Sequence, residues 1–232
     1  MNRYGFDVDE IEEISEKLKN HKQLNVISVC SHLSSADDLT KSETTLNQIK
    51  LFGEISDKLE ENLSCRLDKH ILNSDGFLHF PESLFDMVRL GITLFGSYKN
   101  KNLLQVSKLK SVISQNRNIR KGAGVGYSSE FEAEKDMNIS VVPVGYADGL
   151  NRRFGDGKGN VLVNGVLCPI IGKICMDSFI IDTTKVNCKE GDEVEIFGEG
   201  NSILKLSEDL GTIPYEIYST LNRRIKRVYI GN

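Results

Sequence analysis

The sequence contains 232 residues, of which 39% are hydrophobic and 27% are charged, as in ordinary folded proteins. Its 29 basic and 33 acidic residues give a net charge of -4, which is too balanced to indicate nucleic acid as a partner. No apolar run approaches the roughly 18 residues of a membrane span, and no leader-like segment opens the sequence, so we expect no membrane association.

The first hundred residues alternate between helical and strand patterns. Apolar residues at helical spacing predict helices over 11–18 and 46–59, and β-branched or apolar runs predict strands over 26–30, 70–73 and 87–92. This order predicts β/α units of a parallel sheet. Ligands of such sheets gather where strands end, and the following residues lie there: His32, Ser74, and Arg89 to Ile92.

From about residue 104 the pattern changes to short strands separated by Gly, Asn and Asp turns. Strands are predicted over 139–144, 161–163, 166–171 and 193–197, and helices over 204–210 and 215–221. Asn164-Gly165 between two of these strands indicates a tight hairpin. The polar segment 97–102 favours a domain boundary, so we expect a β/α domain at 1–103 and a mainly β domain at 104–232.

About three parallel strands with helices would leave open sheet edges and an uncovered face. An independent domain would hide these surfaces, so we expect that further strands belong before residue 1. The five cysteines form no Cys-x-x-Cys pair and no ligand spacing with the four histidines. We therefore expect free thiols in a reducing cytoplasm and no bound metal.

A set of short strings recurs along essentially the whole chain: MNRYGF at 1–6, SHLSSAD at 31–37, NS at 73–74, VRLGITLFG at 88–96, VGY at 125–127, VGYADG at 144–149, GKICMD at 172–177 and PYE at 214–216. In order and spacing, this set resembles the alanine racemase family. Each string alone arises by chance, whereas their common order in both halves makes coincidence improbable.

The resemblance implies a partial (β/α) TIM-type barrel followed by a mainly β C-terminal domain. It also implies the cofactor pyridoxal 5'-phosphate, alanine as the substrate, D-alanine supply for peptidoglycan, and a head-to-tail homodimer. The resemblance begins partway round the barrel, and no lysine here has the Lys-Ala-Asn-like context of the family's cofactor-bound lysine. We therefore expect these 232 residues to be inactive alone.

Racemisation needs acid-base groups on both faces of the cofactor. By resemblance, one group is the missing lysine and the other is Tyr127, contributed by the partner subunit, with His32 and Arg3 favouring its ionised form. Arg89 matches the arginine that hydrogen-bonds the pyridine nitrogen and leaves it unprotonated. Alone, Tyr127 also fits a half-buried strand aromatic, and Arg89 an ordinary barrel salt bridge.

The remaining carried-over residues concern the phosphate and the substrate. Ser74, the backbone at Gly91 and Ile92, and the Tyr215 hydroxyl match the phosphate donors. The Met176 amide and Arg3 would receive the substrate carboxylate, and Tyr146 and Asp177 match the corridor through which substrate reaches the site. We interpret the remaining charges of these segments as solvated surface groups, namely Lys173, Asp148, Arg152 and Arg153.

Alternatives remain open at this level. The chain could be a catalytically dead module that dimerises or binds a phosphorylated small molecule through Ser74, Gly91 and Tyr215. It could also be a racemase of another amino acid, or a decarboxylase of the same barrel type. A decarboxylase is expected to place a carboxylate where Arg89 stands, which argues against that alternative.

Overall fold

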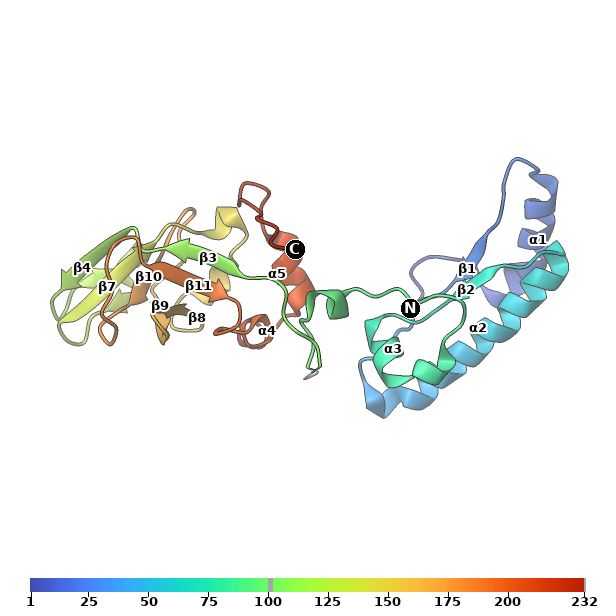
Figure 1. Ribbon diagram of the computed structural model, residues 1–232, viewed down its shortest axis with the longest axis horizontal. Coiled ribbons are helices and arrows are strands. Elements are labelled where there is room, and N and C mark those ends of the chain that lie inside the picture. The colour runs from blue at the N-terminus through green and yellow to red at the C-terminus, as the bar shows by residue number, and fades with distance from the viewer. Residues whose placement is uncertain (100–101, 232) are drawn as a thin grey trace. The chain divides into compact units, whose positions relative to one another are not determined.

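The computed structural model describes residues 1–99 and 102–231 and divides into two compact units, Met1–Leu94 and Phe95–Asn232 (Figure 1). Each unit is considered by itself. Within the described residues, no helix is both long and apolar enough to cross a membrane.

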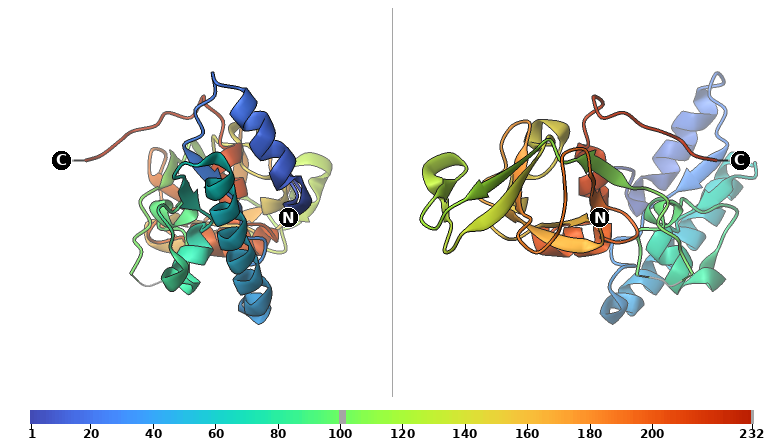
Figure 2. Two further views of the ribbon diagram at one scale, coloured as in Figure 1. Left: turned by 90° about the vertical axis from the view of Figure 1, so that its right-hand side faces the viewer. Right: turned by 60° about the vertical axis from the view of Figure 1, so that its left-hand side comes forward.

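The first unit contains two parallel strands and three helices, with bounds as follows: α1 Ile11–Asn20, β1 Ser28–Cys30, α2 Ser42–Leu63, β2 Asp68–His70 and α3 Ser74–His79. Helix α1 lies alongside α2, as the left view of Figure 2 shows. The apolar stripe of α2 contributes Ile49 and Phe52 to a core that also contains Ile71 and Leu72. The predicted helices are present, and β1 lies within the predicted strand over 26–30. The strand predicted over 70–73 lies two residues too late, because β2 ends at His70.

The predicted strand over 87–92 is wrong. Residues 87–91 belong to no helix or strand. Their backbone hydrogen bonds to the neighbouring segment are sparse: Met87 donates to the Lys69 carbonyl and Arg89 to the Leu72 carbonyl. The Gly91 amide donates to a side chain, the Ser74 hydroxyl, instead of a backbone carbonyl. The first unit consequently has two paired parallel strands where we expected about three.

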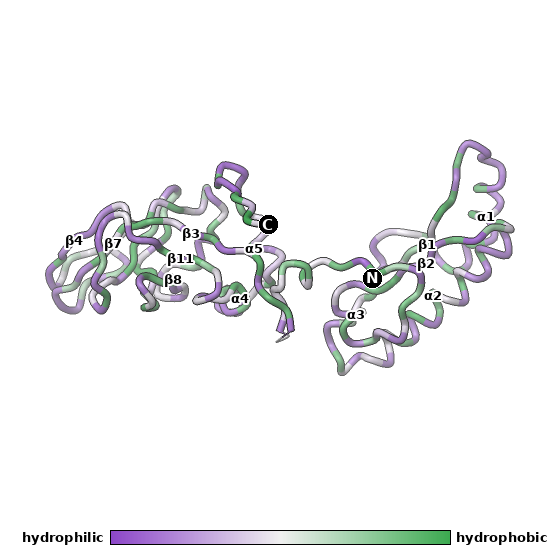
Figure 3. Tube along the Cα trace, in the orientation of Figure 1, coloured by the Kyte–Doolittle hydropathy of each residue, from purple (hydrophilic) through white to green (hydrophobic). Residues whose placement is uncertain are grey.

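The second unit is built on a seven-stranded antiparallel sheet in the order β3-β11-β8-β9-β10-β7-β4, with a separate β5-β6 pair. The strand bounds are β3 Leu109–Val112, β4 Gln115–Ile119, β5 Gly124–Val125, β6 Phe131–Glu132, β7 Met137–Val142, β8 Asn160–Val163, β9 Val166–Ile171, β10 Phe179–Asp182 and β11 Glu193–Phe197. Hydrophobic and hydrophilic stretches both occur in this unit (Figure 3), and buried residues alternate with partly exposed ones along β8 and β10, as expected for a sheet that covers a core on one face.

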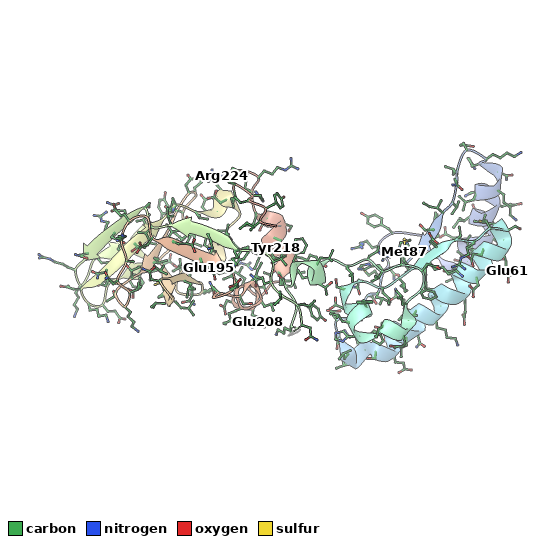
Figure 4. The ribbon with its side chains drawn as sticks, in the orientation of Figure 1. Glu61, Met87, Glu195, Glu208, Tyr218 and Arg224 are labelled. Atoms are coloured by element: carbon green, nitrogen blue, oxygen red, sulfur yellow. The ribbon has the colours of Figure 1, made fainter. Side chains whose placement is uncertain are left out.

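The hairpin prediction is confirmed, since β8 and β9 pair through Asn164 and Gly165, which have φ values of 47° and 80°. Both φ values are positive, as a type I′ turn requires. Helices α4, Ile203–Leu210, and α5, Pro214–Thr220, lie at one end of the sheet (Figure 1). Tyr218 of α5 hydrogen-bonds Ser97 at 2.5 Å and Ser107 at 2.7 Å, which ties the start of this unit to α5 (Figure 4).

Gly149 marks a place where the chain of the second unit packs too closely for a side chain. Its φ is +98°, and an added Cβ would lie 2.1 Å from the carbonyl oxygen of Thr220. Gly165 has a φ of +80° but open space around it.

We expect Gly149→Ala to lower the free energy of unfolding by at least about 3 kcal/mol, because backbone strain and a backbone clash act together. The control Gly165→Ala carries the strain alone and should cost roughly 1 kcal/mol. Urea unfolding of both variants measures the difference. Equal losses would contradict the close approach at Thr220.

Candidate active site

The first group of predicted residues surrounds the half-buried guanidinium of Arg89. Its Nη1 hydrogen-bonds the ring Nδ1 of His70 and donates to the His70 carbonyl oxygen at 3.1 Å. Its Nη2 donates to the Ser31 carbonyl at 2.6 Å and to the His32 Nδ1 at 3.3 Å. Ser31 and His32 immediately follow β1, and His70 ends β2. The guanidinium therefore links the ends of both parallel strands to the segment 87–91, which carries Arg89.

Arg89 also fixes the state of the two imidazoles. A guanidinium only donates hydrogen bonds, so both Nδ1 atoms accept and each neutral ring carries its proton on Nε2. Burial, and then the positive charge of Arg89, lowers the pKa of His32 and of His70. At neutral pH the permanent cation is therefore surrounded by uncharged rings.

Arg3 belongs to the same unit. It is exposed, and its guanidinium carbon lies 5.9 Å from the ring centroid of Tyr4. The charge of Arg3 contributes, after burial and Arg89, to the lowered pKa of His32.

Uncharged hydrogen-bonding groups lie together around Ser74 and Gly91. Ser74 is the first residue of α3 and is 2% exposed; its hydroxyl accepts the Gly91 amide at 2.9 Å and lies 3.1 Å from the Thr93 hydroxyl. Ile92 is buried at the start of a 3-10 helix, Ile92–Phe95. Two hydroxyls and a backbone amide therefore meet at one place.

The second group lies in the other unit and is organised by the loop 172–178. Tyr127, in a 3-10 turn Tyr127–Ser129, is 66% exposed, so the alternative of a half-buried strand aromatic is wrong. Its loop contacts the loop 172–178 because Lys173 forms an ion pair with Glu130. A Cβ on Gly126 would lie 3.6 Å from the Lys173 amide nitrogen, which shows how near the two backbones are.

Backbone hydrogen bonds join the segment that carries Tyr146 to the loop that carries Met176. The Tyr146 amide donates to the Cys175 carbonyl at 3.1 Å, and the Ala147 amide donates to the Met176 carbonyl at 3.0 Å. A Cβ on Gly145 would lie 2.2 Å from the Met176 carbonyl oxygen, so only glycine fits there. Both side chains remain substantially exposed, at 43% for Tyr146 and 55% for Met176.

Asp148 is not the solvated surface charge that we expected. It is 7% exposed and forms an ion pair with Arg224, whose Nε lies 2.6 Å from its Oδ1. The same guanidinium binds Asp177 through Nη2 at 2.7 Å (Figure 4). Tyr215, the second residue of α5, is in the same unit and 45% exposed.

The predicted residues thus form two groups, one in each unit. Arg3, His32, Ser74, Arg89, Gly91 and Ile92 belong to the first unit, and Tyr127, Tyr146, Met176, Asp177 and Tyr215 to the second. Sequence reasoning missed His70, Thr93 and Arg224. His70 was missed because the strand was predicted over 70–73, which places His70 at its start, whereas β2 ends at His70.

Comparisons with known proteins cover the whole chain. The family model for the alanine racemase C-terminal domain matches residues 106–229, and that for the N-terminal domain matches residues 1–99. The chain is 37% identical over 247 residues to alanine racemase 1 of Clostridium acetobutylicum, covering 100% of this chain and 63% of the relative. It therefore spans less than two thirds of the relative's length.

Solved structures show the same fold. Alanine racemase from D-cycloserine-producing Streptomyces lavendulae matches with a TM-score of 0.92 and 28% identity, over 100% of this chain and 64% of that one. Alanine racemase from Bartonella henselae, described with covalently bound pyridoxal phosphate, matches with a TM-score of 0.85 and 32% identity, over 99% and 64%. The predicted fold class, a partial barrel followed by a mainly β domain, is confirmed. The match of both family models, in the expected order and on residues carrying the site, shows that the chain belongs to the alanine racemase family.

Proposed function

We propose that the protein takes part in the interconversion of L- and D-alanine with pyridoxal 5'-phosphate as cofactor, in the supply of D-alanine for peptidoglycan, and that the 232 residues alone do not complete the active site. The observation that carries the proposal is Arg89, a permanent cation whose ring partners His32 and His70 are neutral. The relatives named alanine racemase, and the cofactor named for the Bartonella henselae enzyme, support it.

The residues around Arg89 fit an uncharged aromatic nitrogen. A half-buried guanidinium that meets only carbonyls and neutral rings is an electron-poor site, which favours an acceptor atom. Arg89 would hydrogen-bond the pyridine nitrogen and, since it gives up no proton at ordinary pH, would leave that nitrogen unprotonated. The bound cofactor supplies electron withdrawal from the carbon that loses its proton.

The phosphate group would be held by uncharged donors. Ser74, the Gly91 amide and the backbone at Ile92 are the predicted ones, together with the Tyr215 hydroxyl. The Thr93 hydroxyl, 3.1 Å from that of Ser74, extends the set. Hydroxyls and amides can bind a phosphate closely without adding positive charge beside Arg89.

Tyr127 would be the second proton-transfer group, contributed by the partner subunit of a head-to-tail homodimer. Its 66% exposure in this chain leaves the ring accessible for that role. A phenol has a pKa near ~10, so donors or cations must favour its ionised form. The Nε2 hydrogen of neutral His32 and the charge of Arg3 are the candidates.

The Met176 amide and Arg3 would receive the substrate carboxylate, while Tyr146 and Asp177 would border the access corridor.

We further propose the domain division 1–103 and 104–232. The five free cysteine thiols support a reducing cytoplasmic location.

The function is tested with a chimera in which the part of the Clostridium acetobutylicum racemase that this chain does not match is joined before residue 1. With pyridoxal phosphate, the chimera should convert L- to D-alanine, whereas the 232-residue chain alone should not. Tyr127→Phe in the chimera should reduce turnover at least about a hundredfold, because it removes an acid-base group. A chimera that binds the cofactor without racemising would favour the catalytically dead module.

A second prediction concerns the histidines of the 232-residue chain. Because burial and Arg89 lower their pKa, the stability that His32 and His70 contribute is present above the usual imidazole pKa of about 6.5 and is lost as the pH falls. Arg89→Gln should raise the pKa of both rings, since it removes the adjacent charge. NMR titration of the imidazoles measures this shift.

The matched control is Arg66→Gln, which removes an exposed arginine paired with Asp86. It should leave the pKa of both histidines where they are. Unchanged histidine pKa values in Arg89→Gln would contradict the cluster on which the proposed function depends.

A further inference from the structure

We propose that Arg224 is a positioning residue, which holds the loop carrying Tyr146 and the loop carrying Met176 and Asp177 in one fixed arrangement. The proposal rests on the proposed function, because it assigns these loops to the substrate corridor. It goes beyond that function in making the width of the corridor depend on one side chain that lies outside both loops.

The contacts of Arg224 join three segments that are distant in the sequence. Its Nε binds Asp148 at 2.6 Å and its Nη2 binds Asp177 at 2.7 Å. The planar guanidinium presents both donors in one rigid fork, so it fixes the distance between the two carboxylates, which a lysine ammonium could not do in the same way. Asp148 and Asp177 belong to the two loops themselves.

The two arms differ in burial. The side chain of Asp148 is 11% exposed, whereas that of Asp177 is 65% exposed. The second carboxylate oxygen of Asp148 accepts the Gly145 amide at 2.8 Å. The Arg224 guanidinium beside it holds the pKa of Asp148 below its ordinary value, so the ion pair persists at neutral pH. The Asp148 arm is therefore the stronger one.

The loops that Arg224 joins leave little room between them. The Ala147 amide donates to the Met176 carbonyl, and Gly145 has no space for a Cβ against the same carbonyl. The turn that carries Arg224 is itself held, because the Asn222 amide donates to the Asp148 carbonyl at 2.8 Å and Arg227 donates to the Leu221 and Asn222 carbonyls. A shift of Arg224 would thus be transmitted to Tyr146 and Met176.

Amide hydrogen exchange of the 232-residue chain tests the clamp without cofactor or activity. In Arg224→Gln, exchange at the amides of Gly145, Tyr146 and Ala147 should become roughly tenfold faster. The reason is that the ion pairs of Arg224 no longer oppose local opening of this loop. Core amides of β9 and β10 should change less than about twofold. Arg223→Gln is the matched control: Arg223 is exposed and has no hydrogen bond or ion pair within residues 1–99 and 102–231.

Unchanged exchange in the loop, or an equal rise in the loop and in β9 and β10, would overturn the positioning role. Asp177→Asn removes only the ion pair with the exposed Asp177 and leaves the ion pair with the buried Asp148. It therefore keeps the test usable if Arg224→Gln does not fold. It should speed exchange at Ala147 while Gly145, held by Asp148, stays protected. Equal acceleration at both amides would contradict the two-arm arrangement.

A second arm of the experiment uses the chimera. Arg224→Gln should raise KM for alanine more than it lowers kcat, and it should reduce the preference for alanine over larger amino acids. Arg224→Lys should restore part of each effect. If the unaltered chimera does not racemise, the proposed function fails, while the exchange experiment still decides whether Arg224 holds the loops. Equal KM and kcat for alanine in the unaltered chimera and in the Arg224→Gln chimera would overturn the inference.

Discussion

The first unit depends on how one half-buried cation is hydrogen-bonded. A guanidinium taken out of water is costly unless its N-H groups find acceptors, and Arg89 finds them in the Ser31 and His70 carbonyls and in two imidazole rings. To provide these acceptors, both parallel strands must end at the same place. Ser74 comes shortly after His70 in the sequence, and Gly91 comes shortly after Arg89. Their hydroxyl and amide therefore meet close to this cation. The proposed cofactor site therefore depends on how one charge is hydrogen-bonded.

In the second unit, close backbone packing and ion pairs together hold the loops that carry the predicted site residues. The loop 172–178 lies against the Tyr127 loop on one side and the Tyr146 loop on the other, and ion pairs from Lys173 and Arg224 close the two contacts. Because the neighbouring backbones approach within van der Waals distance, the exposed side chains project from a framework with little freedom. The exposure of Tyr127 on such a framework is consistent with its proposed contribution to the site of a partner subunit.

Local patterns in the sequence predicted the elements whose cause is local. Strand β11 and the Asn164-Gly165 hairpin are set by alternation and turn chemistry and were placed correctly. The segment 87–92 was wrongly predicted as a strand because its apolar pattern suits one. Its hydrogen bonds are instead set by distant residues, namely the Ser74 hydroxyl and a few backbone carbonyls of the neighbouring segment. Arg224 was missed and Asp148 misjudged for the same reason: 76 residues separate the pair, and no local pattern encodes it.

The central claim is that Arg89 supplies a cation to an uncharged pyridine nitrogen. Nitrogen NMR of ring-labelled pyridoxal phosphate, bound at saturating concentration to the chain, reads the protonation state of that atom directly. The account predicts the chemical shift of an unprotonated, hydrogen-bonded nitrogen, and a change in that shift when Arg89 is replaced by glutamine. The shift of a protonated pyridinium, or a shift that Arg89→Gln leaves unchanged, would contradict it.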